Sequence, residues 1–317
     1  MTAARLTTTL ARGALGLVGL GAGCLAYASL VEVRAFALRR VEVPVLPAGA
    51  DPVRVLHVSD LHLTPAAVAR QRWVAGLAAL EPDLVVNTGD NLAHPDSVPY
   101  VLGALGRLLE VPGVYVWGSN DYYAPGLKNP LSYLVRPSRP REARQRDLPW
   151  PELGAGFRAA GWTDLTHTST TLEIRGLRMA FRGVDDAHLG RADYSLVAGP
   201  VDRSAVDVSV AVTHAPYRSV LDPMAADGHD LIVAGHTHGG QVCVPFYGAL
   251  VTNCDLDTAR VKGLSQHTAE DHTSWLHVSA GLGTSPYAPV RFACRPEATL
   301  LTLTARGTDA SPGTAMG

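Results

Sequence analysis

The sequence predicts an α/β protein built on a parallel sheet, and three features of the chain indicate this fold class. Apolar, β-branched segments at 53–60, 83–90 and 113–121 are typical of strands. Segments at 64–80 and 98–110 separate them and carry apolar residues at helical spacing. Alternation of strand and helix predicts parallel pairing through right-handed crossovers. The near-continuous apolar character of the strands favours a sheet covered on both faces.

The first helix has recognisable start signals. Thr64 is suited to cap its N-terminus, and Pro65 is suited to its first turn. Apolar residues then recur along one face, at Val68, Val74, Leu77 and Leu80.

The second half of the chain is organised differently. Residues 122–152 are rich in Pro, Arg and Tyr and show no periodicity, which predicts a functional lid or a flexible insert. A short helix follows at 152–162, and the small, polar residues 305–317 predict a disordered tail. The whole domain is expected to span 51–304. Shorter strands are expected at 170–175, 177–184, 207–213, 230–235, 241–246, 274–280 and 297–304.

The N-terminus stands apart in composition. Residues 13–31 include no charged residue, and this length approaches what a bilayer crossing requires. We therefore expect residues 1–40 to form a single-pass membrane anchor and linker. A cleaved signal peptide is the alternative, because Ala26-Tyr27-Ala28 resembles a cleavage site. Basic residues flank both ends, so the side of the membrane is left open.

Composition excludes some classes of function. A net charge of −2 over 317 residues gives no basic face for nucleic acid. The four cysteines form no Cys-x-x-Cys pair, which argues against a thiolate zinc site. Cys254 and Cys294 could form a disulfide if the domain lies outside the cytoplasm.

Polar residues stand at the ends of five expected strands, where α/β proteins place their ligands. Each has a structural alternative, since Asp is a common turn former and a lone His is usually structural. Such residues need not cluster at strand ends, however, and these do. The residues are Asp60, His62, Asp90, the segment 118–121, His214, His236 and His238.

This donor set predicts a metal centre. A mixture of carboxylates, imidazoles and an amide without thiolate suits Mn, Fe or Zn. There are more donors than one open catalytic ion needs, so we expect two divalent or trivalent ions that share a carboxylate. Asp90 is expected to be the shared ligand, because it lies between the two groups in strand order.

The motifs "SDLH", "GD", "GSND", "THAP" and "GHTHGGQ", in this order, resemble the calcineurin-like metallophosphoesterases. They are most similar to the membrane-associated bacterial branch that includes the Bacillus YkuE-type phosphoesterases. The resemblance extends from about Val53 to Leu303. It implies a four-layer α/β/β/α sandwich in which a metal-bridging hydroxide attacks phosphorus.

The resemblance also assigns the ligands. It implies one metal on Asp60, His62, Asp90 and His238. It implies a second metal on Asp90, the amide of the third motif, His214 and His236.

The third motif departs from the family pattern. The family normally has Gly-Asn-His there, whereas this chain has Gly118-Ser119-Asn120. Either Ser119 binds the metal weakly or the loop shifts so that Asn120 supplies the oxygen, and an amide is the better hard ligand. In both cases the usual histidine is missing, and general acid catalysis is typically worth about 10²–10⁴-fold.

Other groups near the motifs could act in catalysis or binding. Asn120 and His94 are the candidate catalytic residues, although His94 could simply begin a helix before Pro95. We expect Ser119, Asp121 and Tyr122 to contact substrate, with packing as the alternative for the tyrosine.

The sequence therefore predicts a dinuclear-metal hydrolase that cleaves a phosphoester or phosphoanhydride. Its substrate would be a phosphorylated small molecule or a lipid-linked one. The alternative is a catalytically impaired scaffold that kept the fold, as the altered third motif suggests. A metallopeptidase is disfavoured because no HExxH sequence occurs.

Overall fold

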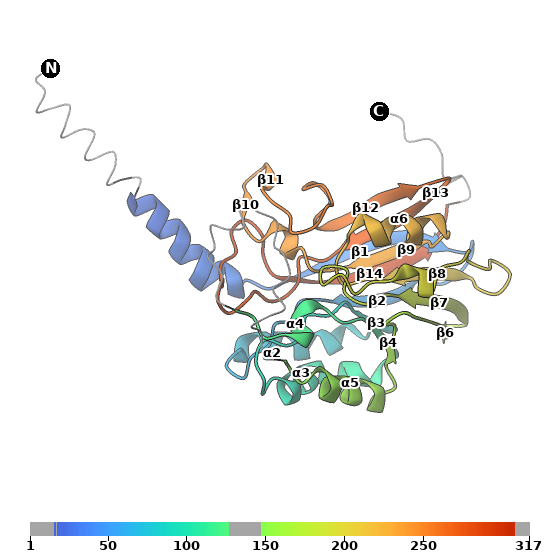
Figure 1. Ribbon diagram of the computed structural model, residues 1–317, viewed down its shortest axis with the longest axis horizontal. Helices are drawn as coiled ribbons and strands as arrows, with labels where there is room; N and C mark the ends of the chain where they lie inside the picture. The colour runs from blue at the N-terminus through green and yellow to red at the C-terminus, as the bar shows by residue number, and fades with distance from the viewer. Residues whose placement is uncertain (1–15, 17, 127–146, 308–317) are drawn as a thin grey trace, which may run out of the picture.

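Two six-stranded sheets form the centre of the protein (Figure 1), in a computed structural model that describes residues 16, 18–126 and 147–307. The first sheet contains, in spatial order, β1 (Ala37–Leu46), β14 (Glu297–Ala305), β2 (Val53–Val58), β3 (Leu84–Asn87), β4 (Gly113–Tyr115) and β5 (Thr163–Asp164). The second contains β12 (Gly263–Ala269), β13 (His272–Val278), β9 (Leu231–Ala234), β8 (Val208–Val212), β7 (Leu177–Gly183) and β6 (Thr168–Ile174). A separate pair comprises β10 (Cys243–Val244) and β11 (Gly248–Ala249).

Helices cover the outer faces of both sheets. Residues of α2 (Val68–Gly76), α3 (Val98–Leu105) and α5 (Trp150–Ala159) pack on the first sheet, and α6 (Arg218–Ala226) packs on the second. The short α4 (Ser119–Tyr122) follows β4. Single turns complete the fold: η1 (Tyr27–Val31), η2 (Glu32–Arg34), η3 (Leu77–Leu80), η4 (Gly106–Glu110), η7 (Tyr194–Leu196) and η8 (His238–Gly240).

The predicted parallel pairing is confirmed. Strands β2, β3, β4 and β5 pair in parallel, as do β7, β8, β9 and β13. Along β2, Leu56 and Val58 face the helices while Val53 and Val55 face the second sheet. Both faces of the strand are therefore buried, which explains its continuous apolar sequence.

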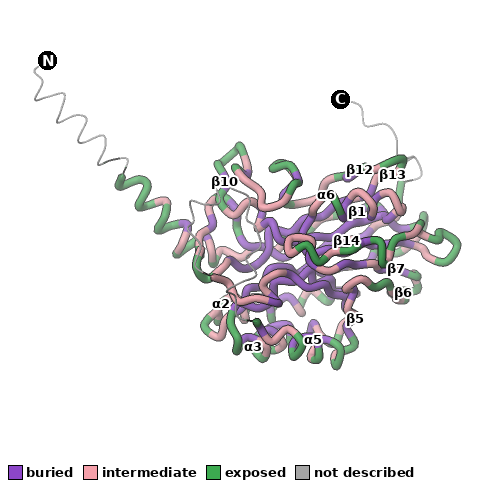
Figure 2. Tube along the Cα trace, viewed as in Figure 1, coloured by how far each residue is buried: buried purple, intermediate pink, exposed green. Residues whose placement is uncertain are grey.

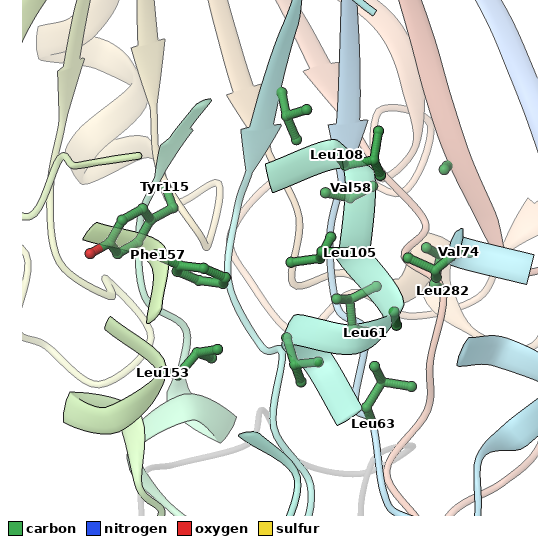
Figure 3. Close-up of a cluster of buried hydrophobic side chains, with 14 of the residues drawn as sticks. Val58, Leu61, Leu63, Val74, Leu105, Leu108, Tyr115, Leu153, Phe157 and Leu282 are labelled. Atoms are coloured by element: carbon green, nitrogen blue, oxygen red, sulfur yellow. The ribbon is translucent and has the colours of Figure 1, made fainter. Parts of the chain in front are cut away.

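Burial follows these layers. Figure 2 shows the buried residues concentrated along the two sheets, with exposed residues at the periphery. Figure 3 shows Leu105 and Phe157 from the helices beside Val58 and Tyr115 from the first sheet. The apolar cores thus lie between the sheets and beneath each helical layer, and they hold the strand ends rigidly.

Several predicted boundaries are corrected. The first helix begins at Val68 with Ala67 at its N-cap position, and the Thr64 carbonyl accepts a turn hydrogen bond from the Ala67 N–H. Strand β1 was not predicted; it pairs with β14 and extends the domain into residues assigned to the anchor and linker. Glu32 is buried and accepts the Cys294 N–H at 2.6 Å, so the domain also includes this turn.

The predicted membrane anchor is not supported. Among the described residues, no helix combines the length and apolar character required to cross a bilayer. The helix that ends near Val31 projects away from the sheets (Figure 1) and exposes Val18, Leu20 and Leu25. Residues 13–15 and 17 of the predicted anchor lie outside the described residues.

The predicted insert and tail are only partly described. Residues 127–146 and 308–317 lie outside the described part of the chain. The two ends of the insert meet at a bridge between Tyr123 and Asp147, and α5 begins three residues later at Trp150. All four cysteines are described and are free thiols; Cys294 Sγ donates to the His238 carbonyl at 3.3 Å, whereas Cys254 Sγ lies 3.0 Å from Thr252 Oγ1.

Candidate metal centre

The strand ends that carry the predicted ligands share an unusual backbone conformation. A side chain makes a positive φ unfavourable for any residue except glycine, and such strain concentrates at functional sites. Positive φ angles occur at Asp60 (51°), His62 (39°), Asp90 (57°), His236 (68°) and His238 (50°). The fold therefore holds these side chains in positions that ordinary strand geometry would not give them.

Four of the predicted ligands form one cluster. Ligand atoms of Asp60, His62, Asp90 and His238 all lie within 4.8 Å of one another. His62 Nε2 is 3.5 Å from Asp90 Oδ2, and His238 Nε2 is 3.5 Å from Asp60 Oδ1. Asp60 Oδ1 is buried and has no hydrogen-bond partner among the described residues. The arrangement fits a cation held between these groups.

Two further histidines lie on the other side of Asp90. His214 Nε2 is 3.5 Å from Asp90 Oδ1, and His236 Nδ1 is 3.3 Å from His214 Nε2. His214 Nδ1 donates to the Thr88 carbonyl at 2.6 Å, which directs its Nε2 toward Asp90. His236 Nε2 is buried without a hydrogen-bond partner in the described part of the chain. Asp90 thus lies between two donor groups.

Burial shifts the pKa values of the residues in this cluster. It lowers the pKa of His62 and His236 well below the usual value and lowers that of His238 to about 3, so these rings stay neutral. Burial also raises the pKa of Asp60. Burial acts to lower the pKa of His214 as well, but the charges of Asp90 and neighbouring carboxylates raise it to about 9. Neutral imidazoles and carboxylates are the forms that bind metal, so the cluster fits a metal ion, and a metal on His214 would have to displace its proton.

The residues of the third motif, Gly118-Ser119-Asn120, lie against Asp90. A Cβ on Gly118 would overlap Asp90 Oδ1 and lie 2.6 Å from His214 Cε1, so only glycine fits there. Asn120 donates its backbone N–H to Asp90 Oδ1 and its side-chain amide to Asp90 Oδ2, both at 2.7 Å. Ser119 Oγ accepts from the Asn120 amide at 3.3 Å. The structure therefore brings Asn120 onto the Asp90 carboxylate.

Two predicted substrate contacts are corrected. Asp121 is completely buried, and its carboxylate accepts backbone N–H groups of Asp90, Asn91 and Gly118. Tyr122 is 5% exposed and donates its hydroxyl to Asp185 Oδ1 at 2.8 Å. Their polar groups are already used inside the protein, so both residues have structural roles.

His94, which the sequence offered as a catalytic residue, lies on an exposed turn. Its Nδ1 accepts the Asp96 N–H at 3.1 Å, and its side chain is about half exposed, at 47%. This local hydrogen bond belongs to the turn before α3 and matches the structural alternative.

A different histidine lies beside the cluster. The ring of His188 is 4.5 Å from the ring of His236, centre to centre. Its Nδ1 lies 3.0 Å from the Tyr217 hydroxyl, which itself donates to the Asn253 carbonyl at 2.9 Å. His188 Nδ1–H is therefore the donor in this pair. No spacing in the sequence distinguished His188, because it lies on a loop after β7.

A buried arginine also supports the site and was not predicted. Arg291 is fully buried and donates to the carbonyls of Ala280, Gly281 and Gly283. Its guanidinium lies 3.3 Å from His238 Nδ1. The only sequence signal was the arginine in "PVRFACRPE", within a stretch that fits the family.

Comparison with known proteins agrees with this geometry. A family model described as calcineurin-like phosphoesterase matches residues 53–240. The chain is 26% identical over 274 residues to the metallophosphoesterase YkuE of Bacillus subtilis, covering 83% of each. It is 25% identical over 286 residues to the phosphodiesterase YaeI of Escherichia coli, covering 87% of this chain and 92% of that protein. It is 28% identical to a Bos taurus protein named transmembrane protein with metallophosphoesterase domain, covering 85% of this chain and 57% of that protein.

Proposed function

This chain belongs to the calcineurin-like phosphoesterase family, and from that premise we propose that it hydrolyses a phosphoester or phosphoanhydride bond with two metal ions. The observation that carries the proposal is the position of Asp90 between two donor groups, one with His62 and one with His214. We take the substrate to be a phosphorylated small molecule or a lipid-linked one, as the sequence predicts.

The residues divide naturally between two ions. One ion would be held by the cluster of Asp60, His62, Asp90 and His238. The other would be held by Asp90, Asn120, His214 and His236. Ions bound there would lower the pKa of a water and neutralise charge on the phosphoryl oxygens.

Asn120 is the proposed ligand from the third motif. Its amide nitrogen now points at Asp90 Oδ2, and rotation of the amide by a half turn would present the oxygen instead. Ser119 makes no such contact in the described structure. The amide oxygen is also the stronger ligand for a hard ion.

The experiment for this proposal combines metal analysis with turnover. We expect the purified chain to carry about two transition ions and to hydrolyse an aryl phosphate or an aryl phosphodiester. Asn120→Ala should lose one ion, whereas Ser119→Ala should keep both, because only Asn120 reaches Asp90. Elemental analysis of the three proteins measures this directly.

The opposite results are equally informative. Metal loss in Ser119→Ala alone would assign the ligand to the serine. A wild-type chain that binds no more than one ion and stays inactive with added Mn²⁺ would favour a scaffold that kept the fold.

His188 is the candidate to replace the histidine missing from the third motif. Its ring packs on that of His236, and Tyr217 fixes its orientation through Nδ1. Because Nδ1–H is already donated to Tyr217, the ring would act as an imidazolium that donates from Nε2 to an oxygen of the leaving group. Loss of one such donor typically costs about 10²–10³-fold in turnover.

His188→Gln should therefore slow hydrolysis by about 10²-fold for an alkyl phosphate and far less for a p-nitrophenyl ester. A poor leaving group carries more charge on its oxygen and needs the donor more. His94→Gln, at an exposed turn, is the matched control and should behave as wild type. Equal losses on both substrates, or loss of metal from His188→Gln, would assign the residue a structural role.

A further inference from the structure

A buried row of hydrogen bonds leads from the second sheet to the predicted ligand Asp60. His277 Nδ1 lies 3.0 Å from His57 Nδ1, and His57 Nε2 lies 2.9 Å from Thr88 Oγ1. Thr88 Oγ1 donates to Ser59 Oγ at 2.6 Å, and Ser59 Oγ donates to Asp60 Oδ2. His277 is 1% exposed, and the other four residues are completely buried. We call this row the Asp60 relay.

The Asp60 carboxylate, at one end of the Asp60 relay, determines the direction of every hydrogen bond in it. An ionised carboxylate only accepts, so the Ser59 hydrogen points at Asp60 and the Thr88 hydrogen points at Ser59. Thr88 then has no hydrogen left, and His57 must donate from Nε2. His57 Nδ1 is consequently an acceptor, so His277 must donate from Nδ1. The two tautomers are thereby fixed.

The Asp60 relay separates the two oxygens of Asp60. Oδ2 accepts from Ser59 and, at 3.1 Å, from the His236 N–H. Oδ1 has no hydrogen-bond partner in the described chain and lies 3.5 Å from His238 Nε2. One oxygen is thus held by the protein, and the other is directed into the metal cluster.

The surroundings of the Asp60 relay make unpaired polar groups unfavourable. His57 and His277 meet between the two sheets, where apolar residues surround them and buried polar groups are unfavourable unless fully paired. A Cβ on Gly235 would overlap the Ser59 hydroxyl and lie 2.7 Å from Asp60 Oδ2. Glycine at this position leaves room for the last bond of the row.

We propose that His57 and His277 are positioning residues that act through Thr88 and Ser59 to orient Asp60 for metal binding. The inference rests on the proposed function in one respect, because it takes Asp60 as a metal ligand. It assigns a role to two histidines that have no ligand spacing in the sequence. The alternative is that the row only satisfies buried polar groups and stabilises the fold.

Metal affinity distinguishes these roles. Thr88→Val keeps the shape of the side chain but removes its hydroxyl, whereas Thr88→Ser keeps the hydroxyl. Titration of the full chain with Mn²⁺ in a calorimeter should show one ion bound about 10–100-fold more weakly by Thr88→Val, with affinity restored in Thr88→Ser. His57→Gln should weaken Mn²⁺ binding as well. The double variant with Thr88→Val should bind little more weakly than either single variant, since both substitutions interrupt the same row of hydrogen bonds.

His229→Gln is the matched control, because this buried histidine bonds to Ser209 and has no link to Asp60. It should lower the melting temperature without changing Mn²⁺ affinity. Thr88→Val with wild-type affinity, or His229→Gln with an equal loss, would overturn the proposal. A wild-type chain that binds no Mn²⁺ would overturn the metal-centre proposal and this one together, whereas normal binding with no Thr88 effect would overturn only this one.

A second measurement needs no variant and remains decisive if Thr88→Val does not fold. Nitrogen-15 spectra of histidine-labelled wild-type protein report which ring nitrogen carries the proton. We expect His57 to be protonated at Nε2 and His277 at Nδ1. The reverse tautomer at either residue would contradict the direction of the Asp60 relay.

Discussion

Asp90→Asn is expected to abolish binding of both metal ions and to reduce hydrolysis by at least about 10³-fold. Asp90 is 1% exposed, and its two oxygens face His62 Nε2 and His214 Nε2, each at 3.5 Å. The substitution keeps the shape of the side chain but removes the negative charge that two cations would share. Elemental analysis and turnover of an aryl phosphate measure the two effects.

The matched control is Asp96→Asn, which removes the same charge from an exposed side chain in the same connection. It should retain both ions and wild-type turnover. An Asp90→Asn protein that keeps two ions would show that the two donor groups do not depend on a shared carboxylate. If the variant lost only the ion on the His214 side and kept the other, the proposal would be reduced to a single essential metal.

The parts of the site that the sequence predicted are those with a local signal. Each ligand follows an apolar strand, and two residues two positions apart, such as Asp60 and His62, can reach one ion. Parallel pairing then brings separate strand ends to one place. The cluster of Asp60, His62, Asp90 and His238 is therefore foreseeable from order and spacing. Their roles as ligands stay predictions until metal is measured.

The parts that could not be predicted depend on contacts distant in sequence. Strand β1 was taken for a linker because its pairing partner, β14, lies far along the chain; Arg39 and Glu297 pair across 258 positions. His188 reaches His236 only through the fold of its loop. The orientation of an imidazole on a loop leaves no periodic trace in the sequence.

The third motif shows a further limit of prediction from the sequence. The sequence predicted a functional role for Gly118-Ser119-Asn120-Asp121, but it could not assign a separate role to each of the four residues. The structure separates them, because Asn120 contacts Asp90 through its amide whereas Asp121 points into the protein. Residue type alone suggested a substrate contact for Asp121, yet burial and backbone hydrogen bonds decide its role.

Asp121→Ala is expected to destabilise the fold by about 3–5 kcal/mol and to weaken metal binding at the same time. The Asp121 carboxylate accepts from the backbone N–H groups of Asp90 (2.8 Å), Asn91 (2.7 Å), Leu92 (3.3 Å) and Gly118 (3.0 Å). It therefore joins the ends of β3 and β4 beneath Asp90. Burial and the charge of Asp90 raise its pKa to about 7, a cost that a bound cation beside Asp90 would reduce. Denaturant unfolding and Mn²⁺ titration measure the two losses.

The matched control is Asp230→Ala, because Asp230 is also buried but serves a different part of the fold. Its carboxylate accepts from Ser209 N–H at 2.8 Å and from the guanidinium of Arg203 at 2.6 Å. Its loss should lower stability, since it too leaves a buried backbone donor, the Ser209 N–H, unpaired, while metal affinity stays near wild type. Only a carboxylate that fixes the ligand loops should change both quantities. If Asp121→Ala lowered stability but bound Mn²⁺ normally, the loops would keep their geometry without it, and Asp121 would be a stabilising residue alone.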